Sequence, residues 1–436
     1  MKLIHNMVTI PLGEGEYLLV NTLNGLIDKI NEEIYGTLNA WAELDNIEPS
    51  SDSEQELFDG LKHRGYIVLD EEAEANLKSS ILDKLREAHK KAKEQIKNIS
   101  FILTYDCNFR CPYCFEADNP PAPGIISKDM VDAAFSVVNG EPEGILLFGG
   151  EPLLLRNRDI IEYIVSKQPK AQYRITTNGY HLLEYLDLLK SMNIHNIQVT
   201  LDGNKESHDS RRYLASGSPT YDKIMEGIVK CLENKIRLTI RMNLDEDNYD
   251  ECMSLRQALT NALPNSEDFL SFEMQPIFQI DNKVRSEMLE RLHIADIGKS
   301  EEELFTSNRI LTSSNPIIKY FLYKKKISPM YSFCHAHINS LVFDPLGDIY
   351  PCLVAVGKRH LSVGTYYPDI QFKDKSIFNR NIESIKECSE CKHALICGGG
   401  CPISACNEED VFKPNCASAL HDIYNLVPII YKKTVG

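Results

Sequence analysis

The sequence contains no run of about 18 apolar residues, the length that a membrane-spanning helix needs, so we expect no membrane segment. The first residues, Met1–Asn6, lack the apolar stretch and cleavage site of a secretory signal, which favours a cytoplasmic protein. Positive charge is also scarce, because the net charge is −16. A chain this acidic is not expected to bind nucleic acid through the phosphate backbone.

Cysteine, by contrast, is plentiful: the 436 residues include 13 cysteines. In a reducing compartment these should be thiols, metal ligands or catalytic groups rather than disulfides. Three lie within Cys107–Cys114 and eight lie between Cys334 and Cys416. A disulfide scaffold would spread its cysteines through small loop-rich domains, so this clustering indicates metal. The two isolated cysteines, Cys231 and Cys252, are predicted to be buried thiols.

Residues 1–75 are predicted to form a small α+β domain of the winged-helix type. Its expected elements are a hairpin over Val8–Pro11 and Tyr17–Asn21, a helix through Leu26, Ile30 and Ile34, a helix carrying Leu57 and Leu61, and a strand at Tyr66–Leu69. This segment holds four Lys or Arg against 16 Asp or Glu, a net charge of −12. Most of the excess negative charge therefore lies there. Residues 76–98 are predicted to be a connecting helix.

Between residues 99 and 305, apolar strand patterns alternate with helical ones. The strand candidates are Ser100–Tyr105, Ile145–Phe148, Tyr173–Thr176, Asn196–Leu201, Arg237–Met242 and Phe269–Met274. Six β/α units in series predict an α/β fold with a parallel sheet curved into a partial (β/α)6 TIM barrel. Chemistry in such barrels lies at the carboxyl ends of the strands. Residues 306–436 are loop-rich and hold most cysteines, as expected of a region folded around metal.

The segment Cys107-Asn-Phe-Arg-Cys111-Pro-Tyr-Cys114 is the strongest chemical signal. Three thiolates this close can hold three irons of a [4Fe–4S] cube and leave the fourth iron without a protein ligand. An open metal position is where a substrate binds. Zinc would need a fourth ligand, and its cysteine pairs are usually separated by two residues, whereas the first gap here is three residues.

This cysteine pattern resembles that of the radical S-adenosylmethionine (SAM) superfamily. The resemblance implies that the amino and carboxylate groups of SAM chelate the open iron, and that one electron cleaves the sulfonium to a 5′-deoxyadenosyl radical. A flavodoxin- or ferredoxin-like donor would supply that electron. Tyr113 matches the family position whose backbone lies near the adenine. No catalytic base is assigned.

The carboxyl ends of the next strands carry further matches. Gly149-Gly150-Glu151-Pro152 is an ordinary turn by itself, but beside the cysteine triad it resembles the family motif for the amino group of SAM. The segments Thr176-Thr-Asn178-Gly and Thr200-Leu-Asp202-Gly, with His208-Asp209 and Arg212 downstream, resemble the part of peptide-modifying members that lines the ribose and carboxylate. The cofactor-binding residues that the resemblance implies are Tyr113, Gly149, Gly150, Glu151, Thr176, Asn178, Thr200, Asp202 and Arg212.

The remaining cysteines resemble the auxiliary-cluster domain named SPASM. The series runs through Cys334, Gly347-Asp-Ile-Tyr-Pro-Cys352, Cys388-Ser-Glu-Cys391, Cys397, Cys401 and Cys416. By the family's ligation, one auxiliary [4Fe–4S] cluster takes Cys334, Cys352 and Cys401, and a second takes Cys388, Cys391, Cys397 and Cys416. Three clusters are therefore expected in all. Some relatives have another cysteine early in this series, but residues 335–351 contain none. Either Cys406 is the fourth ligand of the first auxiliary cluster, or that iron is open to substrate.

The N-terminal domain resembles the leader-recognition domain of maturases that modify ribosomally made precursor peptides. A DNA-binding winged helix is opposed by its negative charge, and a peptide added to a sheet edge suits the fold better. The predicted function is hydrogen abstraction from a precursor peptide followed by an intramolecular crosslink, of the sactipeptide or ranthipeptide type, with a Cys thioether favoured.

Several alternatives stay open. The crosslink could join two carbons, such as Lys to Trp. A sulfatase-maturing dehydrogenase that makes formylglycine shares the clusters but needs no leader domain. A ferredoxin-like electron carrier is opposed by the Gly-Gly-Glu-Pro motif and the barrel, and a nonenzymatic peptide chaperone would explain only the first 75 residues.

Overall fold

The structure is a computed structural model. It describes residues 1–114, 116–117, 124–138, 141–245, 247–263, 266, 268–277, 315–334, 336–373, 376–406 and 410–435. The chain divides into two compact units. Unit 1 comprises Met1–Ala92, Ser313–Cys334 and Asn379–Gly436, and unit 2 comprises Lys93–Thr312 and His335–Phe378. The predicted boundary between residues 305 and 306 lies outside the described residues.

Unit 1 begins with two small antiparallel sheets and two helices. The strands are β1 (Lys2–Leu3), β2 (Met7–Gly13), β3 (Glu16–Asn21), β4 (Ile27–Asn31) and β5 (Ile67–Val68), and the helices are α1 (Glu32–Ala42) and α2 (Asp52–His63). Strand β3 lies between β2 and β4, and β1 pairs with β5. The predicted hairpin, second helix and closing strand are all present.

The predicted helix through Leu26, Ile30 and Ile34 is wrong. Residues 27–31 are strand β4, which pairs with β3, and the helix begins only at Glu32. The Asn31 side chain accepts a hydrogen bond from the Ile34 backbone N–H at 2.9 Å, so it caps that helix. Apolar residues four positions apart share one face of a strand as well as of a helix, so their spacing could not distinguish the two.

The helices α1 and α2 pack on these strands around Trp41, the only tryptophan of the chain. Its ring meets Phe58 edge-on at 6.1 Å between centroids. Trp41 is therefore a core residue. Leu23 belongs to a second core, which it shares with Tyr331 and Leu395 from the carboxyl-terminal parts of unit 1. Residues 1–75 are thus packed within a larger folded unit.

The long helix α3 (Glu71–Lys93) follows, where residues 76–98 were expected to be helical. Its Glu74 carboxylate is buried and accepts hydrogen bonds from the backbone N–H groups of His5 and Asn6. The rest of unit 1 is built from α11 (Pro316–Tyr323), α13 (Ala394–Cys397), α14 (Pro402–Cys406), α15 (Cys416–His421), a π-helical segment at Asp422–Leu426 and α16 (Val427–Thr434).

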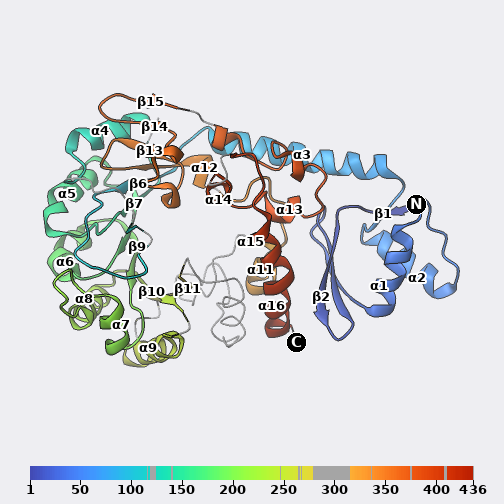
Figure 1. Cartoon of the computed structure of the whole chain (residues 1–436), viewed down its shortest axis with the longest axis horizontal. Helices are drawn as coiled ribbons and strands as arrows, with labels where there is room; N and C mark the ends of the chain where they lie inside the picture. The colour runs from blue at the N-terminus through green and yellow to red at the C-terminus, as the bar shows by residue number, and fades with distance from the viewer. Residues whose placement is uncertain are drawn as a thin grey trace. The chain divides into compact units, whose positions relative to one another are not determined.

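Unit 2 contains the predicted six parallel strands in sequential order. They are β6 (Asn98–Ile102), β7 (Gly144–Phe148), β8 (Gln172–Thr177), β9 (Ile194–Thr200), β10 (Leu238–Leu244) and β11 (Leu270–Pro276). The helices between them are α4 (Lys128–Val137), α5 (Arg158–Lys167), α6 (Leu182–Ser191), α7 (Lys205–Arg211), α8 (Tyr221–Glu233) and α9 (Tyr249–Ala262). These helices line the outer side of the curved sheet (Figure 1). The partial (β/α)6 barrel is confirmed.

The sheet extends beyond β6 in a way that the sequence did not predict. Strand β12 (Ser340–Phe343) lies parallel to β6, and β13 (Asp348–Tyr350), β14 (Gly364–Thr365) and β15 (Gln371–Phe372) continue from it in antiparallel fashion. Short helix α12 (Ala336–Asn339) precedes β12. Part of the cysteine-rich region therefore completes the barrel sheet. Among the residues that the structure describes, no helix is long and apolar enough to cross a membrane.

Candidate cluster and cofactor sites

The cysteine triad lies in the loop that follows β6, at the carboxyl end of the parallel sheet. This loop is held against the segment after α7. Arg110 donates its backbone N–H to the Tyr213 carbonyl at 3.0 Å, and the Ala215 N–H donates to the Asn108 carbonyl at 2.8 Å. Phe109 between them is buried. The loop is therefore fixed by backbone pairing on both sides of Phe109.

The Gly-Gly-Glu-Pro turn after β7 packs directly against the start of that loop. Gly150 donates its N–H to the Thr104 carbonyl, and Glu151 donates its N–H to the Asp106 carbonyl, both at 2.9 Å. A Cβ atom on Gly149 or Gly150 would come within 2.4 Å of backbone oxygens of residues 104 and 106. The two glycines are thus required for backbone-to-backbone contact within the chain, whatever ligand lies beside them.

The Glu151 carboxylate joins the turn to the next strand. It is buried and accepts three hydrogen bonds, from the Leu153 N–H at 2.8 Å, the Thr177 hydroxyl at 2.6 Å and the Asn178 N–H at 2.7 Å. Burial raises its pKa, and these donors act in the opposite direction. A carboxylate has about four acceptor positions. One position therefore remains for a donor outside the chain, such as an amino group.

Asn178 carries this connection to the cysteine loop. Its side-chain amide donates to the Asn108 Oδ1 atom at 2.8 Å and faces the Cys107 sulfur at 3.9 Å. The carboxyl ends of β6, β7 and β8 are in this way linked by one chain of hydrogen bonds through Glu151.

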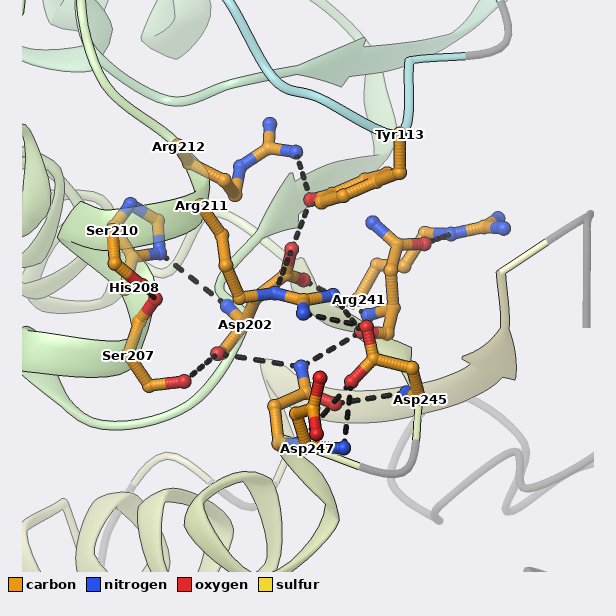
Figure 2. Close-up of polar contacts among 12 residues, drawn as sticks. Tyr113, Asp202, Ser207, His208, Ser210, Arg211, Arg212, Arg241, Asp245 and Asp247 are labelled. Atoms are coloured by element: carbon orange, nitrogen blue, oxygen red, sulfur yellow. Dashed lines mark hydrogen bonds and ion pairs between the residues drawn. The ribbon is translucent and has the colours of Figure 1, made fainter.

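A second group of polar residues surrounds Asp202, just after β9 (Figure 2). Asp202 is fully buried, and its carboxylate accepts the Tyr113 hydroxyl and the Asn243 N–H, the latter at 2.9 Å. Arg212 donates to the same Tyr113 hydroxyl at 2.8 Å. Arg211 lies 3.8 Å from the carboxylate and pairs with Asp245 at 2.5 Å. Tyr113, Asp202 and Arg212 are therefore brought together.

His208 fixes the backbone of Asp202. Its Nδ1 atom accepts the Asp202 N–H at 3.3 Å, and its Nε2 atom lies 3.1 Å from the Thr220 hydroxyl oxygen. That hydroxyl already donates to the Arg212 carbonyl, so it must accept from Nε2. The contacts define a neutral imidazole protonated on Nε2. Burial lowers the pKa of His208 to about 3, which is consistent with a neutral ring.

The electrostatics of the triad are dominated by burial. Burial raises the pKa of Cys107 to about 12, and it also raises the pKa values of Cys111 and Cys114. In all three cases the positive charge of Arg212 acts in the opposite direction. A buried cation beside three thiols favours their ionised form, which is the form that binds metal.

The structure also shows residues that the sequence did not single out. The Glu151 contact is made by Thr177, whereas Thr176 lies on the opposite face of β8. Thr200, one of the residues that the sequence did single out, is buried at the end of β9. Asn108, Arg211, Thr220 and Asp245 complete the two networks. Polar residues next to a motif were a usable signal for Arg211 and Asn108, but nothing marked Thr220 or Asp245.

Four of the predicted auxiliary ligands gather within unit 1. Burial raises the pKa of Cys397, and the nearby thiols of Cys416 and Cys391 raise it further. Burial also raises the pKa of Cys388, and Cys397 acts on it in the same direction. His393 Nδ1 is 3.8 Å from the Cys391 sulfur, and its Nε2 lies 2.8 Å from the Tyr424 hydroxyl. These four thiols thus form one cluster of side chains.

The ligands predicted for the first auxiliary cluster are divided between the units. Cys334 and Cys401 belong to unit 1, and Cys352 belongs to unit 2, where it follows β13. The side chain of Cys406 lies outside the described residues. No three His, Cys, Asp or Glu side chains in the described part of the chain are placed to hold a single metal ion. In a [4Fe–4S] cube each thiolate binds a different iron, so the ligands of such a cluster need not converge on one metal ion.

Comparison with known proteins identifies the domain that carries the triad. Residues 101–259 match the profile of the radical SAM superfamily. The chain therefore contains a region similar to radical SAM domains. Over 90% of its length it is 23% identical to the radical SAM cyclopropyl synthase TigE of Paramaledivibacter caminithermalis, covering 88% of that protein.

Solved structures share the fold. The radical SAM protein anSMEcpe with bound AdoMet matches 77% of this chain and 96% of its own, with a TM-score of 0.55 and 18% identity. Streptococcus suis SuiB bound to the precursor peptide SuiA matches 96% of this chain and 99% of its own, with a TM-score of 0.50 and 15% identity. Both likenesses concern the fold.

Radical SAM proteins use SAM and a [4Fe–4S] cluster, and the residues around the triad fit these groups. The Asn108 side-chain nitrogen and the Arg212 Nε atom are buried without a hydrogen-bond partner among the described residues. Buried donors without partners are costly unless a ligand satisfies them. A negatively charged cluster and the carboxylate of SAM are both acceptors that suit them.

Proposed function

We propose that this radical SAM protein is a maturase that crosslinks a ribosomally made precursor peptide. The observation that carries the proposal is the joining of Cys107, Glu151 and Asn178 in one hydrogen-bonded network at the carboxyl ends of three adjacent strands. Active sites of β/α barrels lie at this end. The thiols Cys107, Cys111 and Cys114 would hold the catalytic cluster there.

When bound, the cluster and SAM together supply a 5′-deoxyadenosyl radical. The chain's own part is to bind and orient them. The free acceptor position of Glu151 would receive the amino group of SAM. Arg212 would favour the three thiolates, and Tyr113 and Asp202 would border the nucleoside.

A peptide substrate is supported by relatives and by the N-terminal part of unit 1. SuiB, whose fold extends over nearly the whole chain, was solved with the precursor peptide SuiA, and anSMEcpe was solved with the Cp18Cys peptide. Residues 1–75 form a three-stranded sheet with two edges, β2 and β4, and carry a net charge of −12. A sheet edge can add an extended peptide as a further strand. This part of the chain would bind a basic leader.

The four thiols Cys388, Cys391, Cys397 and Cys416 would hold an auxiliary [4Fe–4S] cluster. Cys334, Cys352 and Cys401 would ligate another, completed either by Cys406 or by the substrate. Closing a crosslink after hydrogen abstraction releases one electron. An auxiliary cluster would give that electron an acceptor, and a flavodoxin- or ferredoxin-like protein would supply electrons to the catalytic cluster.

The bond formed has two candidates. A Cys thioether is supported by the lack of a cysteine in residues 335–351, because an open iron could hold the substrate thiolate. A carbon–carbon bond is supported by the match to TigE, which is named a cyclopropyl synthase and aligns with 90% of this chain. A sulfatase-type substrate would leave the N-terminal part of unit 1 without a role.

The test of the maturase proposal is reconstitution with iron, sulfide and SAM, followed by incubation with the small peptide encoded beside the gene. We expect 5′-deoxyadenosine, and a peptide that has lost two hydrogens. A chain that cleaves SAM but leaves every such peptide unmodified would contradict the peptide substrate. A Glu151→Gln variant should make less product at equal iron content.

A further inference from the structure

A charged pair lies on the inner face of the barrel sheet, where β10 and β11 run side by side. In β10, Arg241 follows Ile240 and precedes Met242, both of which are fully buried. Successive side chains of a strand point to opposite faces, and the helices line the outer face of the sheet (Figure 1), so Arg241 points inward. Glu273 of β11 is its partner in the parallel register and points the same way.

The pair lies next to the residues proposed to border the cofactor. On its other side, Arg241 is in register with Thr200 of β9, and Asp202 follows two positions later. Neighbouring strands are about 4.8 Å apart, so Thr200 and Glu273 are separated by about 10 Å across the sheet. The row of side chains formed by Thr200, Arg241 and Glu273 therefore leads from the proposed cofactor site towards β11.

The polar row beneath this one, towards the amino ends of the strands, is closed by its own hydrogen bonds. The Thr239 hydroxyl donates to Asn196 Oδ1 at 3.1 Å, and its oxygen lies 2.8 Å from the Ser271 hydroxyl oxygen. Thr239 and Ser271 are both buried. These side chains satisfy one another, so this row has no need of a ligand.

The charged pair, in contrast, is only loosely joined. Arg241 Nη1 lies 3.6 Å from Glu273 Oε1, which is beyond the limit of roughly 3.2 Å for an N–H···O hydrogen bond. Glu273 is 8% exposed, yet no residue that the structure describes donates a hydrogen bond to its carboxylate. Within the same described part of the chain, Arg241 donates only through Nε, to Asn243 Oδ1 at 3.0 Å. Charged groups buried without hydrogen bonds are costly, so both have capacity for a ligand.

The chemistry of the pair restricts what that ligand can be. The Arg241 side chain is 33% exposed, so a ligand on the inner face can reach it. The pair has no net charge, and a ligand that carried a charge would compete with one of the two partners for the other. A neutral group that accepts from a guanidinium and donates to a carboxylate satisfies both partners at once. An amide is such a group, and every residue of a peptide except proline supplies a C=O and an N–H.

We propose that Arg241 and Glu273 bind an amide group of the substrate peptide, whose carbonyl accepts from Arg241 and whose N–H donates to Glu273. The proposal rests on the peptide-maturase function proposed above. Hydrogen bonds to charged groups are the stronger ones, so one amide is enough to fix the peptide at this point. The core residue next to that amide is thereby held beside the cofactor site, and such positioning is what a radical reaction on one chosen carbon requires.

The first test replaces both partners together, because a single replacement would leave a lone buried charge. In the reconstituted chain, Arg241→Met combined with Glu273→Met should raise the KM for the peptide encoded beside the gene about tenfold or more, because two charge-assisted hydrogen bonds are lost. The control is Arg158→Met combined with Glu162→Met, a surface pair on α5 with a 2.9 Å contact, which should keep the parent's KM. A parent-like KM in the Arg241 and Glu273 variant would overturn the role.

Formation of 5′-deoxyadenosine without peptide separates the substrate role from a cofactor role. If the Arg241 and Glu273 variant lost this reaction while its peptide KM stayed that of the parent, the pair would serve the cofactor, and the proposal would be overturned. A parent chain that cleaves SAM but modifies no peptide would overturn the proposed function, and this role with it. A parent that crosslinks the peptide, beside a variant with the same KM, would overturn this role alone.

A second test uses the parent chain and decides the question if the double variant does not fold. In a series of versions of the same peptide, each has one backbone amide replaced by an ester, which removes a single N–H donor. We expect one replacement, next to the crosslinked residue, to raise the KM about tenfold. In a folded double variant that ester should cause no further rise. A parent that tolerates an ester at every position of the peptide would refute the binding of a backbone amide.

Discussion

Arg212 donates through Nη1 to the Tyr113 hydroxyl at 2.8 Å, and Tyr113 in turn donates to Asp202. The aromatic residue inside the cysteine motif is thereby tied to the residue after β9 and to a buried cation. Arg212 also opposes the rise in pKa that burial causes at each cysteine of the triad. The same guanidinium thus orders the motif and favours thiolates.

The first prediction concerns the triad. Replacing Cys107, Cys111 and Cys114 with Ala should remove about four irons per chain and abolish reductive cleavage of SAM, because these thiols would be the only protein ligands of the catalytic cluster. Iron analysis and 5′-deoxyadenosine production are the measurements. The matched control is Cys231→Ala, a buried thiol on α8, which should keep both. Cleavage that survived in the triple variant would refute the assignment.

Much of the barrel could be predicted from sequence, because central parallel strands are short apolar runs separated by helices. The strands β12–β15 were missed because they have only two to four residues each. The motifs of the site were predicted from the sequence, but the contacts between its residues were not. Whether Thr176 or Thr177 faces Glu151 depends on strand orientation, and this leaves no residue pattern.

The second prediction uses the two threonines as a matched pair. Thr177→Val removes the 2.6 Å hydrogen bond to the buried Glu151 carboxylate, and an unsatisfied buried acceptor costs about 1–3 kcal/mol. We expect a lower free energy of unfolding and weaker SAM binding. Thr176→Val, on the other face of β8, should leave the free energy of unfolding nearly unchanged. Urea unfolding under anaerobic conditions measures the free energy of unfolding of both variants. Equal losses in the two variants would contradict the network described for Glu151.

The third prediction concerns His208 and pH. Its pKa is lowered from 6.5 to about 3 by burial, so the unfolded chain binds a proton that the folded chain does not. Stability from this group is complete above pH 6.5 and is lost as the pH falls towards 3. Between pH 6.5 and 5 the loss is about 2 kcal/mol, at about 1.36 kcal/mol per pH unit.

A His208→Gln variant should therefore show a shallower fall in the free energy of unfolding over this pH range than the parent. The exposed His63 on α2 offers the control, since His63→Gln should leave the slope unchanged. A His208→Gln chain with the parent's pH dependence would mean that the folded chain protonates this imidazole as readily as the unfolded chain does.

The fourth prediction concerns the acidic N-terminal part of unit 1. Deleting residues 1–75 would expose the core that Leu23 shares with Tyr331 and Leu395, so surface charges are the better target. Replacing the exposed Glu33, Glu56 and Asp59 with their amides should weaken binding of a basic leader and reduce the salt dependence of its affinity, because charge complementarity steers such encounters.

The matched control for that binding test is the same amide replacement at three exposed acids of unit 2, Asp129, Glu226 and Glu233. These should leave leader affinity unchanged in fluorescence titrations. Equal losses in the two triple variants would show a general effect of net charge rather than a binding surface.

The last prediction decides which bond is formed. Both candidate products lose two hydrogens, so mass alone cannot separate them, but only a thioether consumes a thiol. If the first auxiliary cluster has an open iron, that iron would lower the pKa of the substrate thiol, bind it as a thiolate and hold its sulfur near the carbon radical. The modified cysteine should then resist alkylation by iodoacetamide, and a Cys→Ser precursor should stay unmodified.

The parent enzyme should also change its cluster spectrum when the Cys precursor is added, and Cys406→Ala should keep that response together with its full iron content. A product whose cysteine still reacts with iodoacetamide, or a Cys→Ser precursor that still loses two hydrogens, would refute the thioether. Either result would favour the proposed alternative, a carbon–carbon bond. A Cys406→Ala chain that lost a whole cluster would instead assign Cys406 as the fourth ligand, and would leave no open iron for the substrate.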